Sequence, residues 1–545
     1  MNTYRGIILG LVGCILVAGC AGLLASDQMD SLYTYRSPLH DAPPDPGEPL
    51  GTTLTRKVVL VLIDALRVDT SLEGELMPTL VGLRAQGAWA TIRSRPPSYS
   101  APAWTTILTG AWPDINDGQA LNPPTDDLVR AFTQDDIFSA VDRSMLNSAV
   151  SGYAWFEGML VHSGVDAGFY TPGEDHSADL DVVHAALPWL SGEYALILVH
   201  LDQVDYAGHH EGGPVDPSWN AAARRVDLLL AEIITHLDLS LDTVIVLSDH
   251  GQIDRGGHGG HEAITLIQPF VMVGAGVIPG PYADIQQVDI APTVAALLGI
   301  NIPASSQGRV LLEMLAIHPT DLDAIHNAAT DQRARLLAAY QSSIGVQRTP
   351  KILDTPLSLE EALDDARGSR LSVERTTRGM IAAILAFVPA GYLFMKHRRR
   401  VAWFLAEAGF YVVSFNFAYA VLLRRPYSLS AINSVSDAIV TPGILAMVAF
   451  SLTWLLTSLR SGVFRTFPRQ AAESSLGLTF IVIYVLLFPV LWSYCLNGIQ
   501  ATWTLPDFSS MFVGFLSIIQ ILFVSALGLL LTGASSLLAH FFHAK

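Results

Sequence analysis

The sequence predicts an α/β fold with a mainly parallel sheet and helices on both faces, followed by an α-helical transmembrane C-terminal region. Two observations lead to this prediction. Between residues 56 and 343, short apolar runs such as KVVLVLID and TVIVLSD alternate with helical patterns such as PSWNAAARRVDLLLAEIITHL. Continuous apolar strands separated by helices are typical of a parallel sheet that is covered on both sides. After residue 376, five apolar segments follow that are each long enough to span a bilayer.

The N-terminal 26 residues contain one basic residue and then about twenty apolar ones, which is the pattern of an uncleaved signal anchor or a signal peptide. We favour the anchor. The run LVAGC, which ends at Cys20, also resembles a bacterial lipoprotein cleavage box, so lipidation of Cys20 stays open. Residues 27–55 are rich in proline and polar residues and are expected to form a linker. We expect the α/β domain at 56–343, a juxtamembrane linker at 344–375 and a membrane domain at 376–545.

The distribution of basic residues predicts how the chain is oriented in the cell membrane. The expected spans are about 378–395, 401–423, 438–459, 476–497 and 511–540. The basic loops KHRRR and RSGVFRTFPR follow the first and the third span. If both loops are cytoplasmic, the α/β domain lies on the extracytoplasmic side, as an anchor with Arg5 inside also predicts. Arg424 and Arg425 fall on the outer side and argue against this topology.

Charge and cysteine content exclude two classes of site. Before Thr376 the chain has 21 basic and 46 acidic residues, and from Thr376 onward it has 11 and 4. A front part this acidic repels phosphates, so we expect no nucleic acid as a partner. The three cysteines all lie in apolar runs outside the α/β domain, which therefore has neither a disulfide framework nor a thiolate metal site.

Aspartate and histidine side chains follow three of the predicted strands. They are Asp64 after the first strand, Asp205 and His209 in DQVDYAGH after a second, and Asp249, His250, His258 and His261 in SDHGQIDRGGHGGH after a third. A single aspartate at a strand end is more often only a helix cap, but the carboxyl ends of parallel strands meet at one edge of a sheet. Carboxylates and imidazoles are ligands for zinc, with manganese as the alternative. The pattern predicts a paired-metal hydrolytic or transfer site.

Such a site needs a nucleophile. Ser100 lies in SRPPSYSAPAWTTILTG, a few tens of residues after the first strand. A serine beside a divalent cation can lose its proton near neutral pH and attack phosphorus. Composition alone would favour an ordinary turn at this position.

Four motifs together resemble those of a known superfamily. VLVLIDALRVD, PPSYSAPAWTTILTG, HLDQVDYAGHHEGGP and SDHGQIDRGGHGGHE occur in the order found in the alkaline phosphatase superfamily. The similarity is to its type I phosphodiesterase/nucleotide pyrophosphatase branch, which includes the GPI ethanolamine phosphate transferases. The segment QVDIAPTVAALLGINIP resembles the one that closes the catalytic domain of that branch. The resemblance covers about residues 56–310 and implies an alkaline-phosphatase-like core and a catalytic role for the domain at 56–343.

The resemblance also implies roles for particular residues. One divalent ion, expected to be zinc with manganese as the alternative, would be held by Asp64, Ser100, Asp249 and His250, and a second by Asp205, His209 and His258. Ser100 would be the nucleophile, although threonine is usual in the family. Asn122 would donate a hydrogen bond to a phosphoryl oxygen. The resemblance implies no catalytic or metal-binding role for His261, which would only contact one of the metal-binding side chains. Sulfatases of a sister branch have arginine where this chain has Trp104, which argues against sulfatase chemistry.

Three functions are compatible with these features. The first is a membrane-anchored, metal-dependent transferase that moves a phosphoethanolamine-type head group through a covalent Ser100 intermediate to a glycolipid or surface glycan. The second is an extracytoplasmic phosphodiesterase or nucleotide pyrophosphatase that hydrolyses small phosphodiesters at the same site. The third, a non-catalytic scaffold, predicts missing ligands, yet all seven metal positions hold residues that can bind a metal. We favour the transferase, with a membrane lipid or glycolipid as its partner.

Overall fold

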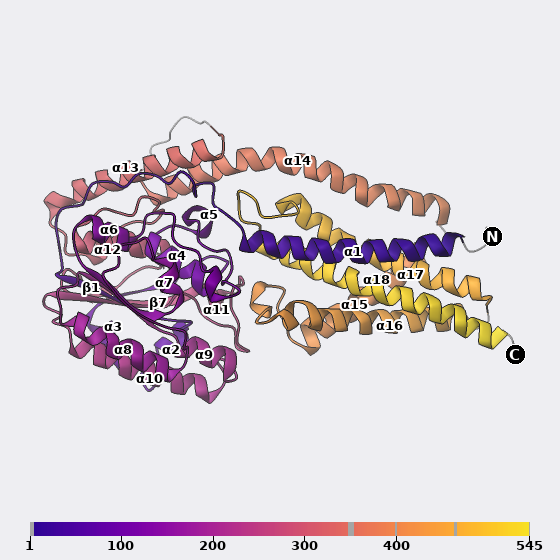
Figure 1. The fold of residues 1–545 in the computed structure, drawn as a ribbon, viewed down its shortest axis with the longest axis horizontal. Helices are drawn as coiled ribbons and strands as arrows, with labels where there is room; N and C mark the ends of the chain where they lie inside the picture. The colour runs from indigo at the N-terminus through magenta and orange to yellow at the C-terminus, as the bar shows by residue number, and fades with distance from the viewer. Residues whose placement is uncertain (1–4, 347–353, 398–400, 463–465, 544–545) are drawn as a thin grey trace. The chain divides into compact units, whose positions relative to one another are not determined.

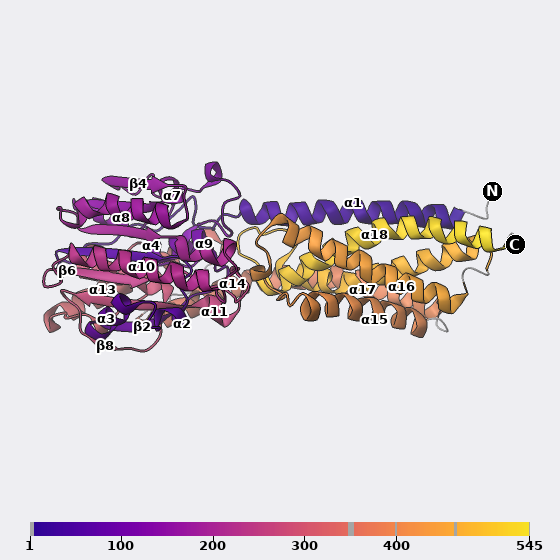
Figure 2. The same ribbon diagram turned by 90° about the horizontal axis from the view of Figure 1, so that it is seen from below.

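The computed structural model describes residues 5–346, 354–397, 401–462 and 466–543. The chain divides into two compact units. The helical unit comprises Met1–Ser31, Ser372–Ala501 and Pro506–Lys545, and the α/β unit comprises Leu32–Leu371 and Thr502–Leu505. Figures 1 and 2 show the ribbon in two views.

The α/β unit is built on one nine-stranded sheet with the order β4-β3-β5-β1-β6-β7-β2-β8, in which β9 also pairs with β2. The strands are β1 Lys57–Ile63, β2 Ala88–Arg93, β3 Ser148–Tyr153, β4 Ala167–Thr171, β5 Leu196–Leu201, β6 Asp242–Leu247, β7 Ile267–Gly274, β8 Gly280–Pro281 and β9 Ile285–Gln286. All pairs are parallel except the two that β7 makes, with β6 and β2. The prediction of a mainly parallel α/β sheet is therefore confirmed.

Helices cover both faces of this sheet (Figure 1). They are α2 Val68–Ser71, α3 Pro78–Gln86, α4 Ser100–Thr109, α5 Pro113–Asn116, α6 Ile137–Arg143, α7 Trp155–Met159, α8 His176–Leu190, α9 Gln203–His210, α10 Pro217–Thr235, α11 Ala263–Leu266, α12 Ile290–Leu298 and α13 Pro319–Ser343. Short 3₁₀ turns lie at Asp126–Leu128, Gln287–Asp289 and Leu312–Met314.

Alternating side chains of β1 divide the interior into two cores. Val58, Leu60 and Leu62 pack on one face with buried residues of α4, α6 and α12. Val59, Val61 and Ile63 pack on the other face with residues of α3, α8 and α10. Because successive side chains of a strand point to opposite faces, an uninterrupted apolar run is what a strand covered on both sides requires.

Two segments that the sequence suggested as linkers have more structure than their composition indicates. Helix α1 Arg5–Tyr33 continues past residue 26, and the chain after it is anchored to the α/β unit because Ser37 N donates to Asp117 Oδ1 at 2.7 Å. Helix α14 Pro356–His397 runs through the charged stretch before the predicted span 378–395. After Pro356 this stretch contains no proline, and its Leu, Glu, Ala and Arg residues favour helix, so a polar composition here does not prevent a helix.

The remaining helices of the helical unit are α15 Val401–Asn416, α16 Thr441–Ser461, α17 Pro468–Asn497 and α18 Phe508–His543. A 3₁₀ turn lies at Leu429–Ala431 and π-helical segments at Phe417–Leu422 and Ser436–Val440. Among the described residues, five helical stretches are long and apolar enough to cross a membrane: Arg5–Tyr33, Ala402–Leu422, Ser436–Arg460, Pro468–Asn497 and Phe508–Phe542. The predicted span 378–395, within α14, is not one of them.

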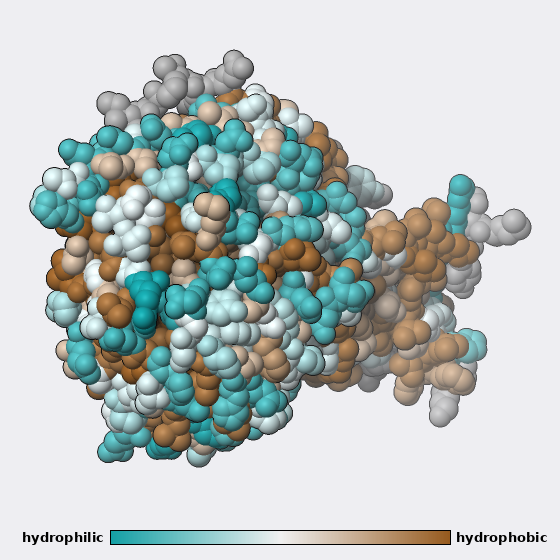
Figure 3. Space-filling view, turned by 60° about the vertical axis from the view of Figure 1, so that its left-hand side comes forward, coloured by the Kyte–Doolittle hydropathy of each residue, from teal (hydrophilic) through white to brown (hydrophobic). Residues whose placement is uncertain are grey.

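The surfaces of the two units differ in character. Many large apolar side chains of the helical unit are exposed, among them Leu16, Trp492 and Leu530. The part of this unit visible in Figure 3 is mostly hydrophobic, whereas the α/β unit shows a mixed surface. Exposed apolar helices of membrane-spanning length are the pattern of a multi-pass membrane protein.

Candidate active site

The carboxyl ends of three adjacent strands bring the predicted acidic residues together. Strands β5, β1 and β6 are neighbours and run in parallel, with Ile63 opposite Leu201 and Leu62 opposite Leu247. Residues that follow these strands therefore emerge at the same edge of the sheet. Asp64 follows β1, and Asp249 lies two residues after the end of β6.

The first predicted ligand set is assembled around the His250 imidazole. Its Nε2 lies 3.4 Å from Asp64 Oδ1 and 3.5 Å from Asp249 Oδ2. Ser100 Oγ lies 3.2 Å from the same nitrogen. All four side chains are buried. The structure thus places Ser100 against the group that the sequence predicted to share a metal with it.

The second predicted set is centred on α9. The segment Gln203–His210 forms this helix, so that Asp205 and His209 lie one turn apart on the same side. Asp205 Oδ2 is 3.5 Å from His209 Nε2, and Asp205 Oδ1 is 3.6 Å from His258 Nε2. The His209 and His258 Nε2 atoms are 2.9 Å apart. The rings of His250 and His258 stack with centroids 3.9 Å apart, so the two sets adjoin.

The glycine-rich loop after β6 returns His258 to the sheet edge. Gly256, Gly257 and Gly259 all have positive φ, a backbone conformation that other residues rarely adopt. A Cβ on Gly259 would lie 2.2 Å from the Tyr99 ring. The concentration of glycines in this segment therefore reflects both the turn and the close approach of the chain to α4.

Ser98 fixes both this loop and the orientation of His258. Its Oγ accepts a hydrogen bond from Gly259 N at 3.0 Å, and its carbonyl oxygen lies 3.0 Å from His258 Nδ1. When Nδ1–H donates to that carbonyl, the lone pair of Nε2 points toward Asp205 and His209, as a metal ligand requires. Ser98 is thus engaged in holding the loop.

Ser100 and Asn122 meet at the N-terminus of α4. Ser100 is the first residue of this ten-residue helix, and Asn122 Oδ1 accepts a hydrogen bond from Ala101 N at 3.0 Å. Free N–H groups and the helix dipole at this end favour negative charge. Because the amide oxygen of Asn122 is engaged, its Nδ2 is the group left to donate.

Three further side chains lie beside the predicted ligands, and the sequence did not identify them. His200 Nε2 lies 3.1 Å from Asp64 Oδ2, and Trp104 Nε1 donates to Asp249 Oδ2 at 2.8 Å. Asp202, Asp64 and His200 offer atoms that all lie within 4.8 Å of one another. The stretch VHLDQVD contained the signal for two of these residues, since they flank the end of a predicted strand.

Burial dominates the electrostatics of this edge. It raises the pKa of Asp64, an effect that the neighbouring Asp249 reinforces, and it also raises the pKa of Asp249. Burial would likewise raise the pKa of Asp205, but His209 and His258 outweigh it and lower that pKa. Burial lowers the pKa of His258 well below 6.5 and that of His200 to about 3, so both imidazoles are neutral at pH 7.

These residues fit a divalent metal site. Within the described part of the chain, Asp64 Oδ1 is buried and has no hydrogen-bond partner. Asp64, Asp249 and His250 form one group of ligand atoms within 4.8 Å, and Asp205, His250 and His258 form another. Buried carboxylates without cationic partners are costly unless a cation compensates them, and the oxygen and imidazole donors present are those that divalent metals use.

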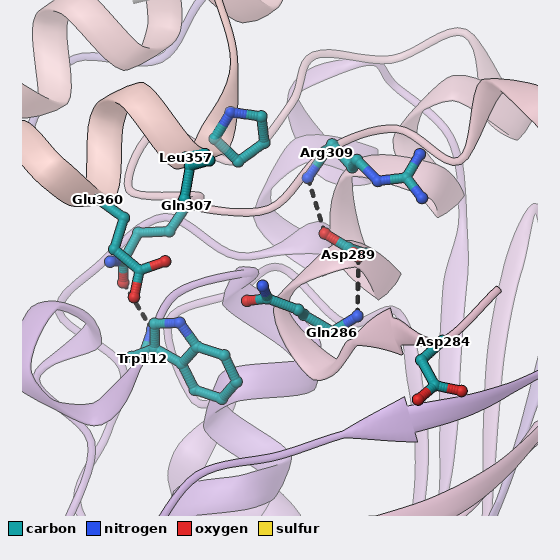
Figure 4. Close-up of a pocket in the computed structure, with 9 residues that line it drawn as sticks. Trp112, Asp284, Gln286, Asp289, Gln307, Arg309, Leu357 and Glu360 are labelled. Atoms are coloured by element: carbon teal, nitrogen blue, oxygen red, sulfur yellow. Dashed lines mark hydrogen bonds between the residues drawn. The ribbon is translucent and has the colours of Figure 1, made fainter.

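Other residues lie outside this cluster. His210, next to His209, and His261 are exposed. A separate cavity of about 140 Å³ is lined by Trp112, Asp284, Gln286, Asp289, Gln307, Arg309, Pro356, Leu357 and Glu360 (Figure 4). Asp289 within it accepts hydrogen bonds from Gln286 N and Arg309 N. None of the predicted site residues lines this cavity.

Comparison with known proteins identifies the family to which this chain belongs. The family described as type I phosphodiesterase/nucleotide pyrophosphatase matches residues 58–117 and 125–352. "GPI ethanolamine phosphate transferase 2" of Schizosaccharomyces pombe is 25% identical over 363 residues, which cover 60% of this chain and 46% of that protein. The human "GPI ethanolamine phosphate transferase 2, catalytic subunit" is 26% identical over 288 residues, which cover 49% and 28%. The chain thus spans less than half the length of these relatives.

Among solved structures, human ectonucleotide pyrophosphatase/phosphodiesterase 5 matches with a TM-score of 0.38 and 14% identity, over 45% of this chain and 95% of that one.

Proposed function

Because this chain belongs to the type I phosphodiesterase/nucleotide pyrophosphatase family, we propose that it is a membrane-anchored transferase that moves a phosphoethanolamine head group through a covalent Ser100 intermediate. The donor is a phospholipid such as phosphatidylethanolamine, and the acceptor is a glycolipid or surface glycan. The names of the relatives support the head group, and the apolar helices support a lipid substrate. The catalytic unit lies on the extracytoplasmic side, as the basic loops predict.

One observation carries this proposal. Ser100 is the only hydroxyl among the predicted ligands, and it lies in the first turn of α4 with its Oγ 3.2 Å from His250 Nε2. Asp64, Ser100, Asp249 and His250 would hold one divalent ion, and Asp205, His209 and His258 the other. When bound, the two ions would supply the positive charge that lowers the pKa of the serine and neutralises the phosphoryl oxygens.

In the first step, Ser100 Oγ loses its proton and forms a bond to the phosphorus of the donor. The bond between phosphorus and the diacylglycerol oxygen breaks, and that oxygen leaves with the electron pair and takes up a proton. Asn122 Nδ2 and the N–H groups at the start of α4 are placed to stabilise charge on the phosphoryl oxygens. The product is a phosphoethanolamine ester of Ser100.

In the second step, a hydroxyl group of the acceptor loses its proton and attacks the same phosphorus. The bond to Ser100 Oγ breaks, and the serine regains a proton. If water takes the place of the acceptor, the same steps hydrolyse a phosphodiester, which is the alternative that the name of the family favours. The two reactions differ only in the group that attacks the esterified serine.

An adduct experiment tests the covalent step. The full-length protein in detergent with zinc is incubated with phosphatidylethanolamine, and separately with bis-p-nitrophenyl phosphate, and its intact mass is measured. We expect a phosphoethanolamine-sized adduct that is absent in Ser100→Ala. Hydrolysis of the diester without a lipid-derived adduct would favour the phosphodiesterase instead.

Ser98→Ala is the matched control, because Ser98 lies two residues away and contacts the glycine loop. It should still carry the adduct. An adduct that survives in Ser100→Ala would remove Ser100 from the nucleophile's role, and unchanged zinc content in both variants would show that the metal site is intact.

A further inference from the structure

One buried carboxylate beside the site has no role in the proposed chemistry. Asp202 follows β5 and precedes α9, and it is only 8% exposed. Its side chain makes no capping hydrogen bond to α9, and no donor among the described residues bonds its oxygens. It belongs to neither predicted set of metal ligands. A carboxylate that is mostly buried and accepts no hydrogen bond from the described residues is available to a ligand.

The surroundings of Asp202 are negatively charged. Burial raises its pKa, and the carboxylates of Asp205, Glu174, Asp179 and Asp249 raise it further. Asp179 is already satisfied, because it accepts hydrogen bonds from Asp202 N at 2.8 Å and from Gln203 Nε2 at 2.8 Å. Asp205 and Asp249 belong to the proposed metal sites. Asp202 and Glu174 remain as carboxylates that neither the fold nor the metals account for.

Aromatic rings adjoin these two carboxylates. Tyr153 is half-buried, and its pKa is raised by burial first and then by the neighbouring Glu174 and Asp202 carboxylates. The Tyr153 ring lies 5.1 Å from Trp155 and 6.4 Å from Trp104, measured between centroids. Trp104 in turn donates to Asp249 within the metal-ligand cluster. Carboxylates beside aromatic rings are the combination that recognises an alkylammonium group.

We infer that Asp202, with Glu174 and Tyr153, binds the ammonium group of the transferred head group while the phosphate lies at Ser100. The inference rests on the proposed function and specifies its donor: a phosphodiester of a short amino alcohol. Asp202 is within 4.8 Å of Asp64, which in turn lies 3.4 Å from His250. The ammonium subsite therefore adjoins the phosphoryl subsite, as a head group with a two-carbon chain between phosphate and amine requires.

A third metal ion would be the competing occupant, because Asp64, His200 and Asp202 approach one another. The metal content of an Asp202 variant separates the two occupants. His200 Nε2 lies 3.1 Å from Asp64 Oδ2, so this imidazole is engaged with that carboxylate. His200 positions Asp64, and the two carboxylates that remain suit an organic cation.

A pair of phosphate esters tests the inference without turnover. Phosphoethanolamine and ethyl phosphate differ only in the amine, and their dissociation constants are measured by calorimetry with the full-length, zinc-loaded protein in detergent. We expect the amine-bearing ester to bind at least about tenfold more tightly to the wild type. In Asp202→Asn this ratio should fall to about one to two. Equal affinity of the wild type for the two esters would overturn the inference.

The control variant is Asp181→Asn, which removes an exposed carboxylate from α8 and should leave the ratio unchanged. If Asp202→Asn does not fold, Glu174→Gln provides the second variant, and it should reduce the ratio at least about threefold. A ratio that stays at the wild-type value in the folded variant contradicts the inference. So does the loss of one equivalent of metal from Asp202→Asn, since that would identify Asp202 as a metal ligand.

The inference and the proposed function fail in different ways. A Ser100 adduct from phosphatidylethanolamine without a preference for the amine would retain the transferase and remove the ammonium site. A preference for the amine that depends on Asp202, without any adduct on Ser100, would retain the ammonium site and remove the covalent transferase mechanism.

Discussion

The two ends of strands β1 and β6 both bury charged side chains, but only one end satisfies them. At the amino end, Lys57 is 1% exposed, and its Nζ donates to the carbonyl oxygens of Trp189 at 3.3 Å, Gly192 at 2.9 Å and Leu190. Beside it, Arg56 makes two hydrogen bonds to Asp242, of 2.9 and 2.8 Å. Each buried charge at this end has partners within the fold.

At the carboxyl end of the same strands, carboxylates face one another. Asp64 and Asp249 are buried together, and Asp64 Oδ1 has no hydrogen-bond partner in the described part of the chain. The difference separates the charges that the fold satisfies from those that remain available to a ligand. A satisfied buried charge contributes to stability, whereas an unsatisfied one persists only where function requires it.

The largest expected effect is at the carboxyl end. Asp64→Asn should reduce activity roughly 10³-fold and lower the metal content, because it removes a charged ligand. It should not lower the thermal midpoint of the metal-free protein. The asparagine oxygen can still accept from His200, and its NH₂ group replaces the unpaired oxygen 3.4 Å from His250 Nε2. Elemental analysis, turnover and melting curves in EDTA measure these three quantities.

Two results would contradict the assignment of Asp64 as a ligand whose charge does not stabilise the fold. Full metal occupancy in Asp64→Asn would show that Asp64 is not a ligand. A midpoint several degrees below that of the wild type in EDTA would show that the charge of Asp64 stabilises the fold. Asp181→Asn, at an exposed position, is the control for loss of a carboxylate.

At the amino end the opposite result is expected. Lys57→Met keeps the aliphatic stem but leaves three carbonyl groups without their donor, which should cost on the order of 3 kcal/mol. The thermal midpoint of the full-length protein in detergent should fall by roughly 5–10 °C. Activity per folded molecule should not change, because Lys57 lies at the other end of β1 from Asp64. A reduced activity with an unchanged midpoint would reverse the assignment of the two ends.

Asp136 is a further buried carboxyl group, away from both ends of these strands, and its titration measures how burial changes the free energy of unfolding. Asp136 caps α6 through Phe138 N and Ser139 N and accepts from the Ser163 hydroxyl at 2.8 Å, yet burial raises its pKa from 3.8 to about 6. The folded state therefore binds this proton more tightly than the unfolded state. Its contribution of about 3 kcal/mol is fully present below pH 3.8 and is lost as the pH rises to 6.

Asp136→Asn keeps the cap but cannot titrate. The midpoint of the wild type relative to this variant should therefore fall between pH 4.5 and 6 and then stay constant to pH 7.5. Differential scanning fluorimetry of both proteins measures that difference, in which the titration of all other groups cancels. Parallel curves would mean that the hydrogen bonds to Asp136 fully compensate its burial.

The sequence predicted the parts of the site that lie next to strand ends. Asp64 and Asp249 directly follow apolar runs, so the parallel sheet alone implies that they meet. Ser100 was predicted from a motif, and its approach to His250 required the actual course of the chain between β2 and α4. Local pattern is sufficient where one strand determines the position of a side chain.

Other features depend on contacts that no local pattern contains. Trp104 is an apolar residue in a helix, and only the packing of α4 on the sheet places its indole N–H on Asp249. Asp202 resembles an ordinary residue at a strand end, and it is distinguished by the absence of a side-chain donor among the described residues. The helical course of α14 before residue 376 was missed because charged residues were taken as evidence of a linker, although many of them favour helix.

The smallest effect is expected at the exposed edge of the amino end. Arg56 is half-exposed and pairs with buried Asp242, which also accepts from Asp238 N at 3.0 Å. Since water screens the guanidinium and the carboxylate keeps another donor, Arg56→Gln should cost at most about 1 kcal/mol, and less at high salt. Melting curves at low and high ionic strength measure both effects. A loss as large as that of Lys57→Met would show that the exposed pair, rather than the buried ammonium, holds this end of the sheet together.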